Sequence, residues 1–342
     1  FLFDNEMKEK FYNVSFDIQP VQESVVWEGV IVKDSMWAYA RGQSAKEKMR
    51  DRYEDTNTEG KFHKYAEELH ERFGKEKMYA NFVRSVYGED IVDFDAQELP
   101  KISIITSVYN GDEFIQPFLE DMTRQTIFEE KCELILINAN SPGNEEEVIK
   151  EYIEKYPNNI VYKKLEKDPG IYGVWNIGVE MASGEYLTNA NLDDRKALYS
   201  IERHARELYL NSEIDLVYAD MMITDKPNET FETNNSYNRK YNFPDFSFKN
   251  LKMVNMPHAS PMWRKEYHEK YGYFDEQYRS AGDWEMWLRG ASKGSKFKKI
   301  HELLGLYYFN PAGISTNPEN FSWKREEEKE IYEKYVNIEL KK

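Results

Sequence analysis

The stretch Ile102-Ser-Ile-Ile-Thr-Ser-Val-Tyr-Asn-Gly111 decides the fold. It opens with a β-branched run, which is typical of a strand buried on both faces of a parallel sheet, and it closes in a turn. A helix is predicted over 113–125, and a second buried strand follows at 133–137. The acidic helix predicted over 145–156 then leads to a third strand at 160–162. This alternation predicts an α/β fold with right-handed connections around a parallel sheet.

Residues that carry chemistry are expected at one edge of that sheet. In an open α/β sheet, ligands bind beyond the carboxyl ends of the strands. Those ends are residues 107–111, 138–143 and 165–172. Further strands are predicted at 185–189 and 215–218, so more residues follow strand ends later in the chain.

The chain changes character near Pro100. Before it, amphipathic helices are predicted at 44–55 and 61–73, with a short strand at 25–32. No motif with recognisable chemistry occurs in this part. The predicted division is a mainly helical N-terminal extension of unknown function over 1–99, an α/β domain over 100–320 and a charged helical tail over 321–342.

Charge and composition limit the function classes. The 342 residues include 62 Asp and Glu against 46 Lys and Arg, which gives a formal charge of −16. Nucleic acids and anionic membrane surfaces bind cationic patches, so neither is expected as the main partner. Aromatic residues make up 15% of the chain. Most are expected in the core, and a few could serve as stacking platforms for flat or ring-shaped ligands.

The compartment is predicted from cysteine content and hydropathy. A single cysteine, Cys132, excludes a disulfide framework within the chain and fits a reducing compartment. No apolar run reaches the ~20 residues that span a bilayer. We therefore expect a cytoplasmic protein, with peripheral association at the inner face of a membrane left open. Because the sequence starts at Phe1, we also expect processing or a piece of a longer, multi-domain polypeptide.

Two acidic motifs stand out. Asn191-Leu-Asp-Asp194 follows a predicted buried strand, and paired carboxylates there could hold Mg²⁺ or Mn²⁺. The alternative is a helix cap with a solvent-facing neighbour. Asp283 precedes a helix with a partly apolar face. It is either a first-turn acid that the helix dipole favours or a general base held at a rigid helix start.

Other candidates are weaker. Asp168-Pro-Gly-Ile-Tyr172 joins a strand to a helix, and its aspartate could cap that helix or bind a base or ribose. His258 is a lone histidine and is more often structural. The sequence has no GxxxxGK[ST] loop, no GxGxxG and no HExxH. P-loop NTPases, Rossmann dehydrogenases and HExxH zinc enzymes are therefore disfavoured.

Taken together, the motifs over about 100–316 resemble the family-2 glycosyltransferases with the GT-A fold. The resemblance is carried by six segments in order. They are Ile104-Ile-Thr-Ser-Val-Tyr-Asn-Gly111 with Gln125-Thr126, Glu133-Leu-Ile-Leu-Ile-Asn-Ala-Asn-Ser141, Asp168-Pro-Gly-Ile-Tyr172 with Trp175-Asn-Ile-Gly178 and Ala182-Ser-Gly-Glu-Tyr186, Asn191-Leu-Asp-Asp194, Gly282-Asp-Trp-Glu-Met-Trp-Leu-Arg289, and Gly313-Ile-Ser315.

The resemblance implies an inverting transfer of a sugar from a nucleotide-diphosphate donor to an acceptor hydroxyl. Asp283 would be the catalytic base, and Asp193 and Asp194 would hold Mn²⁺ or Mg²⁺. The acceptor would be a glycan or a lipid-linked or protein-linked molecule in surface polysaccharide assembly. The donor would contact Ser107, Tyr109, Asn138, Asn140, Asp168, Tyr172 and Asn176, and the sugar or acceptor would face His258, Trp284 and Glu285.

Two departures from the family pattern keep alternatives open. Asn138 and Ala139 stand where the family usually has an acidic pair, and Asn191 stands at the first position of its metal motif. Because alanine cannot accept a hydrogen bond from uracil, the nucleobase is undetermined. The alternatives are a catalytically inactive glycan-binding or scaffold protein on the same fold, and a nucleotidyltransferase. The latter would normally show a basic, glycine-rich loop near the first strand, which this sequence lacks.

Overall fold

The computed structural model describes residues 14–22, 35–54, 74, 78 and 96–339. The chain divides into two compact units, Phe1–Asp93 and Phe94–Lys342. In the described part of the first unit, the antiparallel strands β1 (Phe16–Pro20) and β2 (Met36–Ala40) precede helix α1 (Gly42–Glu54). Helix α1 corresponds to the helix predicted over 44–55, whereas the β1–β2 pair was not expected. The strand predicted at 25–32 and the helix predicted at 61–73 lie outside the described residues.

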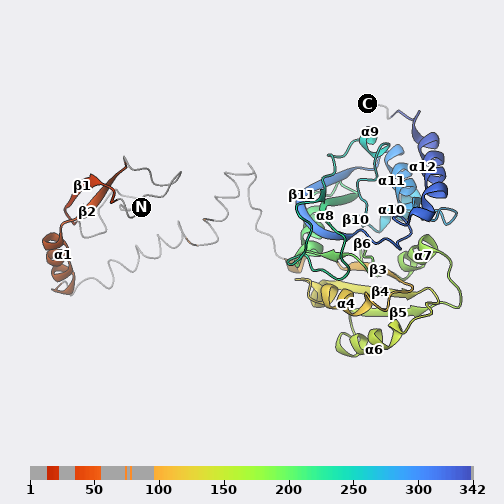
Figure 1. Cartoon of the computed structure of the whole chain (residues 1–342), viewed down its shortest axis with the longest axis horizontal. Coiled ribbons are helices and arrows are strands. Elements are labelled where there is room, and N and C mark those ends of the chain that lie inside the picture. Colours follow the sequence, from red (N-terminus) through yellow and green to blue (C-terminus); the bar gives the residue numbers. More distant parts are fainter. Residues whose placement is uncertain (1–13, 23–34, 55–73, 75–77, 79–95, 340–342) are drawn as a thin grey trace. The chain divides into compact units, whose positions relative to one another are not determined.

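A mixed sheet forms the centre of the second unit (Figure 1). Its strands in chain order are β3 (Ile102–Val108), β4 (Cys132–Asn138), β5 (Ile160–Lys164), β6 (Tyr186–Asn189), β7 (Arg195–Lys196), β8 (Leu216–Thr224), β9 (Lys240–Tyr241), β10 (Pro261–Arg264) and β11 (Phe297–Tyr308). Their order across the sheet is β5-β4-β3-β6-β10-β8-β11-β7, and β9 pairs with β8. Strands β5, β4, β3 and β6 are parallel, but β10 is antiparallel to both β6 and β8. The predicted parallel sheet is thus confirmed for these four strands, and β8 and β11 also pair in parallel. The antiparallel strands β10, β7 and β9 correct the prediction, because they make the sheet mixed.

Helices cover the sheet on both faces. They are α4 (Ile115–Thr123), α5 (Phe128–Lys131), α6 (Glu145–Lys155), α7 (Ile171–Met181), α8 (Ser200–Leu210), α9 (Phe248–Leu251), α10 (Glu266–Tyr271), α11 (Gly282–Ser292) and α12 (Phe321–Tyr335). Short 3₁₀ turns lie at Ala96–Glu98 and Pro318–Asn320. None of the helices in the described ranges is long and apolar enough to cross a membrane.

Side chains of the buried strands alternate between two cores. Successive residues of a strand point to opposite faces of a sheet. Ile104 and Leu134 accordingly belong to a core shared with α4, α6 and α8, whereas Ile105 and Ile135 belong to a second core shared with α7, α10 and α11. Strands β3 and β4 therefore carry apolar residues on both faces, and this is why Ile and Leu follow one another in their sequences.

The carboxyl ends of β3, β4 and β6 meet at one edge of the sheet because these strands are parallel neighbours. The loops after β3 and β6, together with the loop after β5, the starts of α7 and α11 and the segment 307–316, surround a cavity at this edge. Helix α12 packs against α11, with Ile331 and Tyr335 buried at the contact. Lys324 and Glu328 of α12 also line the cavity.

Candidate active site

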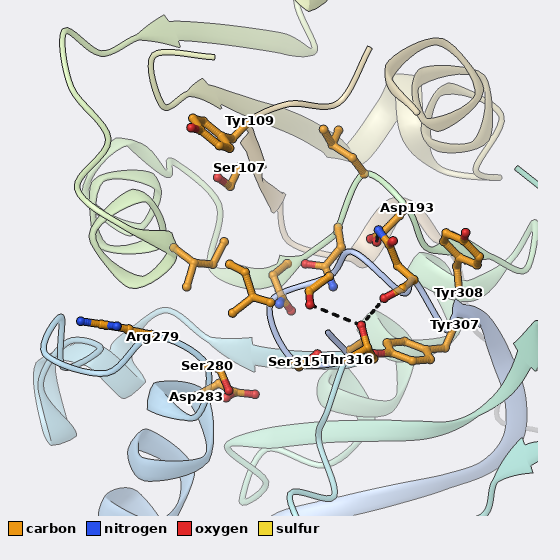
Figure 2. A pocket seen from close by; sticks show the side chains of 18 of the residues that line it. Ser107, Tyr109, Asp193, Arg279, Ser280, Asp283, Tyr307, Tyr308, Ser315 and Thr316 are labelled. Atoms are coloured by element: carbon orange, nitrogen blue, oxygen red, sulfur yellow. Dashed lines mark hydrogen bonds between the residues drawn. The ribbon is translucent and has the colours of Figure 1, made fainter. Parts of the chain in front are cut away.

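The cavity has a volume of about 780 Å³. Figure 2 shows Ser107 and Tyr109 on one side of it, with Arg279, Ser280 and Asp283 on the other. Ser107 is the last but one residue of strand β3, and Asp283 lies in the first turn of α11. Segments far apart in the sequence thus form the walls of the cavity, as the α/β topology requires for a site at a sheet edge.

Asp283 is a buried carboxylate facing this cavity. It is 9% exposed, and both of its oxygens accept hydrogen bonds. The Tyr172 hydroxyl donates to Oδ1 at 3.1 Å, and Asn255 Nδ2 donates to Oδ2 at 2.7 Å. Burial raises the pKa of Asp283, and the two donors oppose that rise because they favour the ionised form. A carboxylate held in this way can accept a proton from a ligand in the cavity.

The Asp168–Tyr172 segment places Tyr172 beside Asp283. Gly170 has φ of +84°, a conformation that favours glycine, and Asp168 Oδ1 accepts a hydrogen bond from its backbone N–H at 2.7 Å. This turn starts α7. The Tyr172 ring stacks on Phe274 at 5.9 Å, so its hydroxyl is held at a fixed position.

Asp193 and Asp194 point to different places. Asp193 lines the cavity, and its Oδ2 accepts a hydrogen bond from Asn310 at 2.9 Å. Asp194 is buried, and its oxygens accept from Asn191 Nδ2 at 2.9 Å and from the Tyr308 backbone N–H at 3.1 Å. Burial and the neighbouring Asp193 raise the pKa of Asp194 to about 7. The structure does not bring the two carboxylates together as a pair facing the cavity.

The described ranges contain no cluster of three or more His, Cys, Asp or Glu side chains that could hold a metal ion. A cation here would need ligands from Asp193, from the amide oxygen of Asn191, which also lines the cavity, and from a bound diphosphate. One or two carboxylates plus substrate phosphates are common ligands for Mg²⁺, so the residues present fit a cation that arrives with the donor.

The residues predicted to contact the donor divide into two groups. Ser107, Tyr109, Asp168 and Tyr172 line the cavity. The other three do not line it, and their surroundings indicate that they stabilise the fold. Asn138 is buried and accepts from the Ser141 backbone N–H at 2.8 Å, Asn140 sits in a turn with φ of +59°, and Asn176 exchanges hydrogen bonds with the backbone of Phe274.

The residues predicted to face the sugar or acceptor also divide. Trp284 and His258 line the cavity. His258 has φ of +42° and packs between Tyr241 and Tyr307, and burial lowers its pKa to about 4, so its ring is neutral near pH 7. Glu285 instead points away from the cavity to α12. It is 1% exposed, and Arg289, Lys334 and Tyr335 all donate hydrogen bonds to it.

Several cavity residues were not anticipated from the sequence. Asn255, Asn310, Arg279 and Lys324 all line it. They lie in irregular segments or on a helix far along the chain, and none belongs to a motif with a recognisable spacing. For Asn255 and Arg279, the only hint in the sequence that they line the cavity is that each lies close in the chain to a predicted site residue. Asn255 comes three residues before His258, and Arg279 comes four residues before Asp283.

Residues 103–272 match the family model "Glycosyl transferase family 2". The second unit of the chain belongs to this family. Over 92 residues the chain is 39% identical to the minor teichoic acid biosynthesis protein GgaB of Bacillus subtilis (strain 168), a match spanning 27% of this chain and 10% of GgaB. Over 219 residues it is 28% identical to the uncharacterized glycosyltransferase YwdF of the same organism, covering 62% of this chain and 76% of YwdF.

Solved glycosyltransferase structures share the fold of this domain. S. aureus TarS in complex with UDP-GlcNAc superimposes with a TM-score of 0.56 at 15% identity, covering 70% of this chain and 68% of that chain. Mannosyltransferase PcManGT from Pyrobaculum calidifontis, in complex with GDP-Man and Mn²⁺, gives a TM-score of 0.54 at 14% identity and covers 80% and 74%. These likenesses confirm the predicted GT-A fold, and the family match confirms that the domain is a glycosyltransferase.

Proposed function

We propose that this glycosyltransferase moves a sugar from a nucleotide-diphosphate donor to an acceptor hydroxyl with inversion at the anomeric carbon, in the assembly of a surface polysaccharide. The observation that carries the proposal is Asp283, a buried carboxylate at the start of α11. It faces the cavity and has both oxygens held by donors. GgaB, of which the chain spans a tenth, is named for teichoic acid biosynthesis, which supports a surface polymer as the product.

The chemistry requires one displacement. Asp283 takes the proton of the acceptor hydroxyl, and the hydroxyl oxygen forms a bond to the anomeric carbon. The bond from that carbon to the diphosphate oxygen breaks, and its electron pair leaves with the nucleoside diphosphate. Because attack and departure occur on opposite faces of the sugar, the configuration inverts. Burial suits the base, since a carboxylate with a raised pKa is a better proton acceptor near neutral pH.

The donor is proposed to lie between the β3 edge and α11. Ser107, Tyr109 and Asp168 would contact the nucleoside, and Trp284 and His258 would face the sugar or acceptor. TarS binds UDP-GlcNAc and PcManGT binds GDP-Man, so the neighbours themselves differ in nucleobase. This variation agrees with the sequence, in which Ala139 leaves the nucleobase of the donor undetermined. The nucleobase is therefore to be found by measuring donor binding.

A divalent cation is proposed to accompany the donor. The cavity is lined by more acidic than basic side chains, namely Glu113, Asp168, Asp193, Asp283 and Glu328 against Arg279 and Lys324. A diphosphate would be repelled by this surplus of negative charge unless a cation offsets it. Asp193, with the amide oxygen of Asn191, would hold Mn²⁺ or Mg²⁺, which would stabilise the leaving diphosphate when bound.

Asp283→Asn tests the assigned base. The variant keeps the size of the side chain but cannot take a proton, so transfer should fall by about 10²–10⁴-fold or more. Donor binding should persist, because the variant leaves the opposite wall intact. Release of nucleoside diphosphate measures turnover, and the donor-induced shift in melting temperature measures binding. Asp245→Asn, an exposed carboxylate that does not line the cavity, is the control. Near-normal turnover in Asp283→Asn would exclude this residue as the base.

A further inference from the structure

A buried arginine follows the turn that carries Asp193. Arg195 is 2% exposed and does not line the cavity, whereas Asp193, two residues earlier, does (Figure 2). The guanidinium of Arg195 donates to two backbone carbonyls and to one side-chain amide. Burying a charge is costly unless the group makes good hydrogen bonds. These three contacts therefore indicate what the arginine does.

The two carbonyls belong to the residues on either side of Asp193. Nη1 of Arg195 donates to Leu192 O at 2.8 Å and to Asp194 O at 2.6 Å. The Leu192 carbonyl is part of the planar peptide that joins Leu192 to Asp193, so a bond to this oxygen fixes the orientation of that peptide. Arg195 thus holds the backbone from which Asp193 reaches the cavity.

The other end of the guanidinium connects this turn to a second wall of the cavity. Nη2 of Arg195 donates to Asn228 Oδ1 at 2.7 Å, and Asn228 Nδ2 donates to Glu113 O at 3.0 Å. Asn228 lies in the connection between β8 and β9 and does not line the cavity, but Glu113, in the loop after β3, does. Arg195 and Asn228 therefore join the Asp193 turn to the β3 loop from outside the cavity.

Arginine suits this position because of its shape. Its planar fork of N–H donors can serve the turn with one nitrogen and Asn228 with the other. A lysine ammonium is a single point of charge and cannot serve both places together. Groups that orient a metal ligand without touching the metal commonly change the affinity for the metal by about 10–100-fold.

We propose that Arg195 is a positioning residue for the cation site, which holds the turn so that Asp193 meets the cation that arrives with the donor, and that Asn228 anchors it to the loop after β3. This rests on the proposed function, in which Asp193 and the amide oxygen of Asn191 hold Mn²⁺ or Mg²⁺. Because the turn is fixed in advance, binding of the cation does not have to order it. Loss of Arg195 should therefore raise the need for the cation without changing the chemical step.

The experiment measures nucleoside diphosphate binding by equilibrium dialysis over a range of Mn²⁺ concentrations. The probe is UDP, GDP, CDP or dTDP, whichever most raises the melting temperature of the full wild-type chain with Mn²⁺ present. The quantity compared is the Mn²⁺ requirement, defined as the Mn²⁺ concentration that gives half-maximal nucleotide binding. This readout does not depend on turnover.

Three variants separate the contacts. Arg195→Met removes every donor of the guanidinium, and Arg195→Lys keeps the charge but loses the fork. Asn228→Gly removes the anchor only. Asn228 has φ of +58°, which glycine adopts freely, so this variant adds no backbone strain.

Arg264→Met is the matched control. Arg264 also donates to three backbone carbonyls, those of Leu208, Asn211 and Ile214, at 2.6, 3.1 and 2.8 Å. It ends β10, and neither it nor these three partners line the cavity. The control should lower the melting temperature and leave the Mn²⁺ requirement unchanged, which separates a loss of stability from a loss of positioning.

Arg195→Met should raise the Mn²⁺ requirement by about 10–100-fold. Arg195→Lys should raise it as well, because one ammonium cannot hold the turn and Asn228 together. Asn228→Gly should raise it by a smaller factor, since the bonds from Arg195 to the turn remain. With the nucleotide sugar of the same base as donor, kcat at saturating Mn²⁺ should stay near the wild-type value, whereas the KM for the donor at low Mn²⁺ should rise.

A wild-type Mn²⁺ requirement in Arg195→Met would overturn the inference and leave the proposed function standing, and so would an equal change in Arg264→Met. A wild-type requirement in Arg195→Lys would overturn it because charge alone would then explain the effect. Tighter Mn²⁺ binding in Arg195→Met would also contradict it. If Arg195→Met does not fold, an unchanged requirement in Asn228→Gly decides against the inference. If nucleotide binding to the wild type does not depend on Mn²⁺, the cation of the proposed function fails, and this inference fails with it.

Discussion

At the residue scale, the contact between Gly282 and Tyr172 links packing to chemistry. A Cβ atom at Gly282 would lie 2.7 Å from the Tyr172 ring, which is too close for two non-bonded carbon atoms. Tyr172 is buried and stacked on Phe274, so the ring cannot move away freely. Gly282→Ala should therefore destabilise the domain by about 1–3 kcal/mol, as overpacking does. It should also lower turnover by displacing the Tyr172 hydroxyl from Asp283.

Gly42→Ala is the matched control for this prediction. Gly42 is likewise the first residue of a helix, but nothing lies within 4 Å of a Cβ built there. This variant should leave both turnover and the unfolding of the glycosyltransferase domain unchanged. Urea unfolding and nucleoside diphosphate release measure the two effects. Equal stability of Gly282→Ala and the wild type would show that Tyr172 has room to move.

Single positions could be predicted from the sequence only where local geometry decides them. Asp283 was placed at a helix start, and it lies in the first turn of α11. Glu285 is predicted to face the sugar or acceptor, but two residues along a helix turn a side chain about 200° to the opposite face from Asp283. It accordingly contacts α12. Asn255 could not be found, because its pairing with Asp283 spans 28 residues and depends on how α9 and α11 pack.

At the element scale, Glu285 ties the helix that carries Asp283 to α12. It accepts hydrogen bonds from Lys334 at 2.8 Å and Tyr335 at 2.7 Å on α12, and from Arg289 on its own helix. Replacing it by Gln removes the buried charge that these donors surround, so Glu285→Gln should destabilise the domain by about 1–3 kcal/mol. Lys324 and Glu328 on α12 line the cavity, and we therefore expect weaker donor binding as well.

The pH dependence gives this prediction a second readout. Burial acts to raise the pKa of Glu285, but the hydrogen bonds from Arg289, Lys334 and Tyr335 together outweigh it and hold the pKa below its ordinary value of about 4.3. The charge therefore stabilises the fold above that ordinary value, and this stabilisation is lost as pH falls through the lower folded pKa. The difference between wild type and Glu285→Gln, measured by urea unfolding, should be constant from pH 6 to 8 and shrink below about pH 4. Glu333→Gln, in an exposed ion pair with Lys329, should change stability little at any pH.

Long, uniform elements were predictable and short ones were not. Strands β3 and β4 are seven residues each and buried on both faces, so their runs of Ile, Leu and Val identify them without further context. Strand β10 has four residues and starts with Pro261, so its sequence does not reveal that it runs antiparallel between β6 and β8. Its place depends on the long connection from β8 through α9, which only the packed structure specifies.

At the scale of the whole molecule, the surplus of acid reaches the site itself. The formal charge is −16, and the lining of the cavity is also more acidic than basic. Glu113 and Glu328 bring part of this surplus to the cavity alongside Asp168, Asp193 and Asp283. A nucleoside diphosphate would add further negative charge. Donor binding should therefore depend on a divalent cation more strongly than in a site lined with lysine and arginine.

The dependence on cation can be measured by thermal shift with UDP-, GDP-, CDP- and dTDP-sugars. At a donor concentration of about 100 Kd, binding stabilises a fold by about 2.7 kcal/mol, which is a shift of several degrees. EDTA should remove that shift, and Mn²⁺ or Mg²⁺ should restore it. Asp193→Ala should lose the Mn²⁺-dependent part, whereas Asp194→Asn should lose less, because Asp194 points into the protein toward Asn191 and Tyr308. A donor shift that survives both EDTA and Asp193→Ala would mean that Arg279 and Lys324 hold the diphosphate without a metal ion. If both variants lose the Mn²⁺-dependent shift to the same extent, both carboxylates bind the cation, as predicted from the sequence.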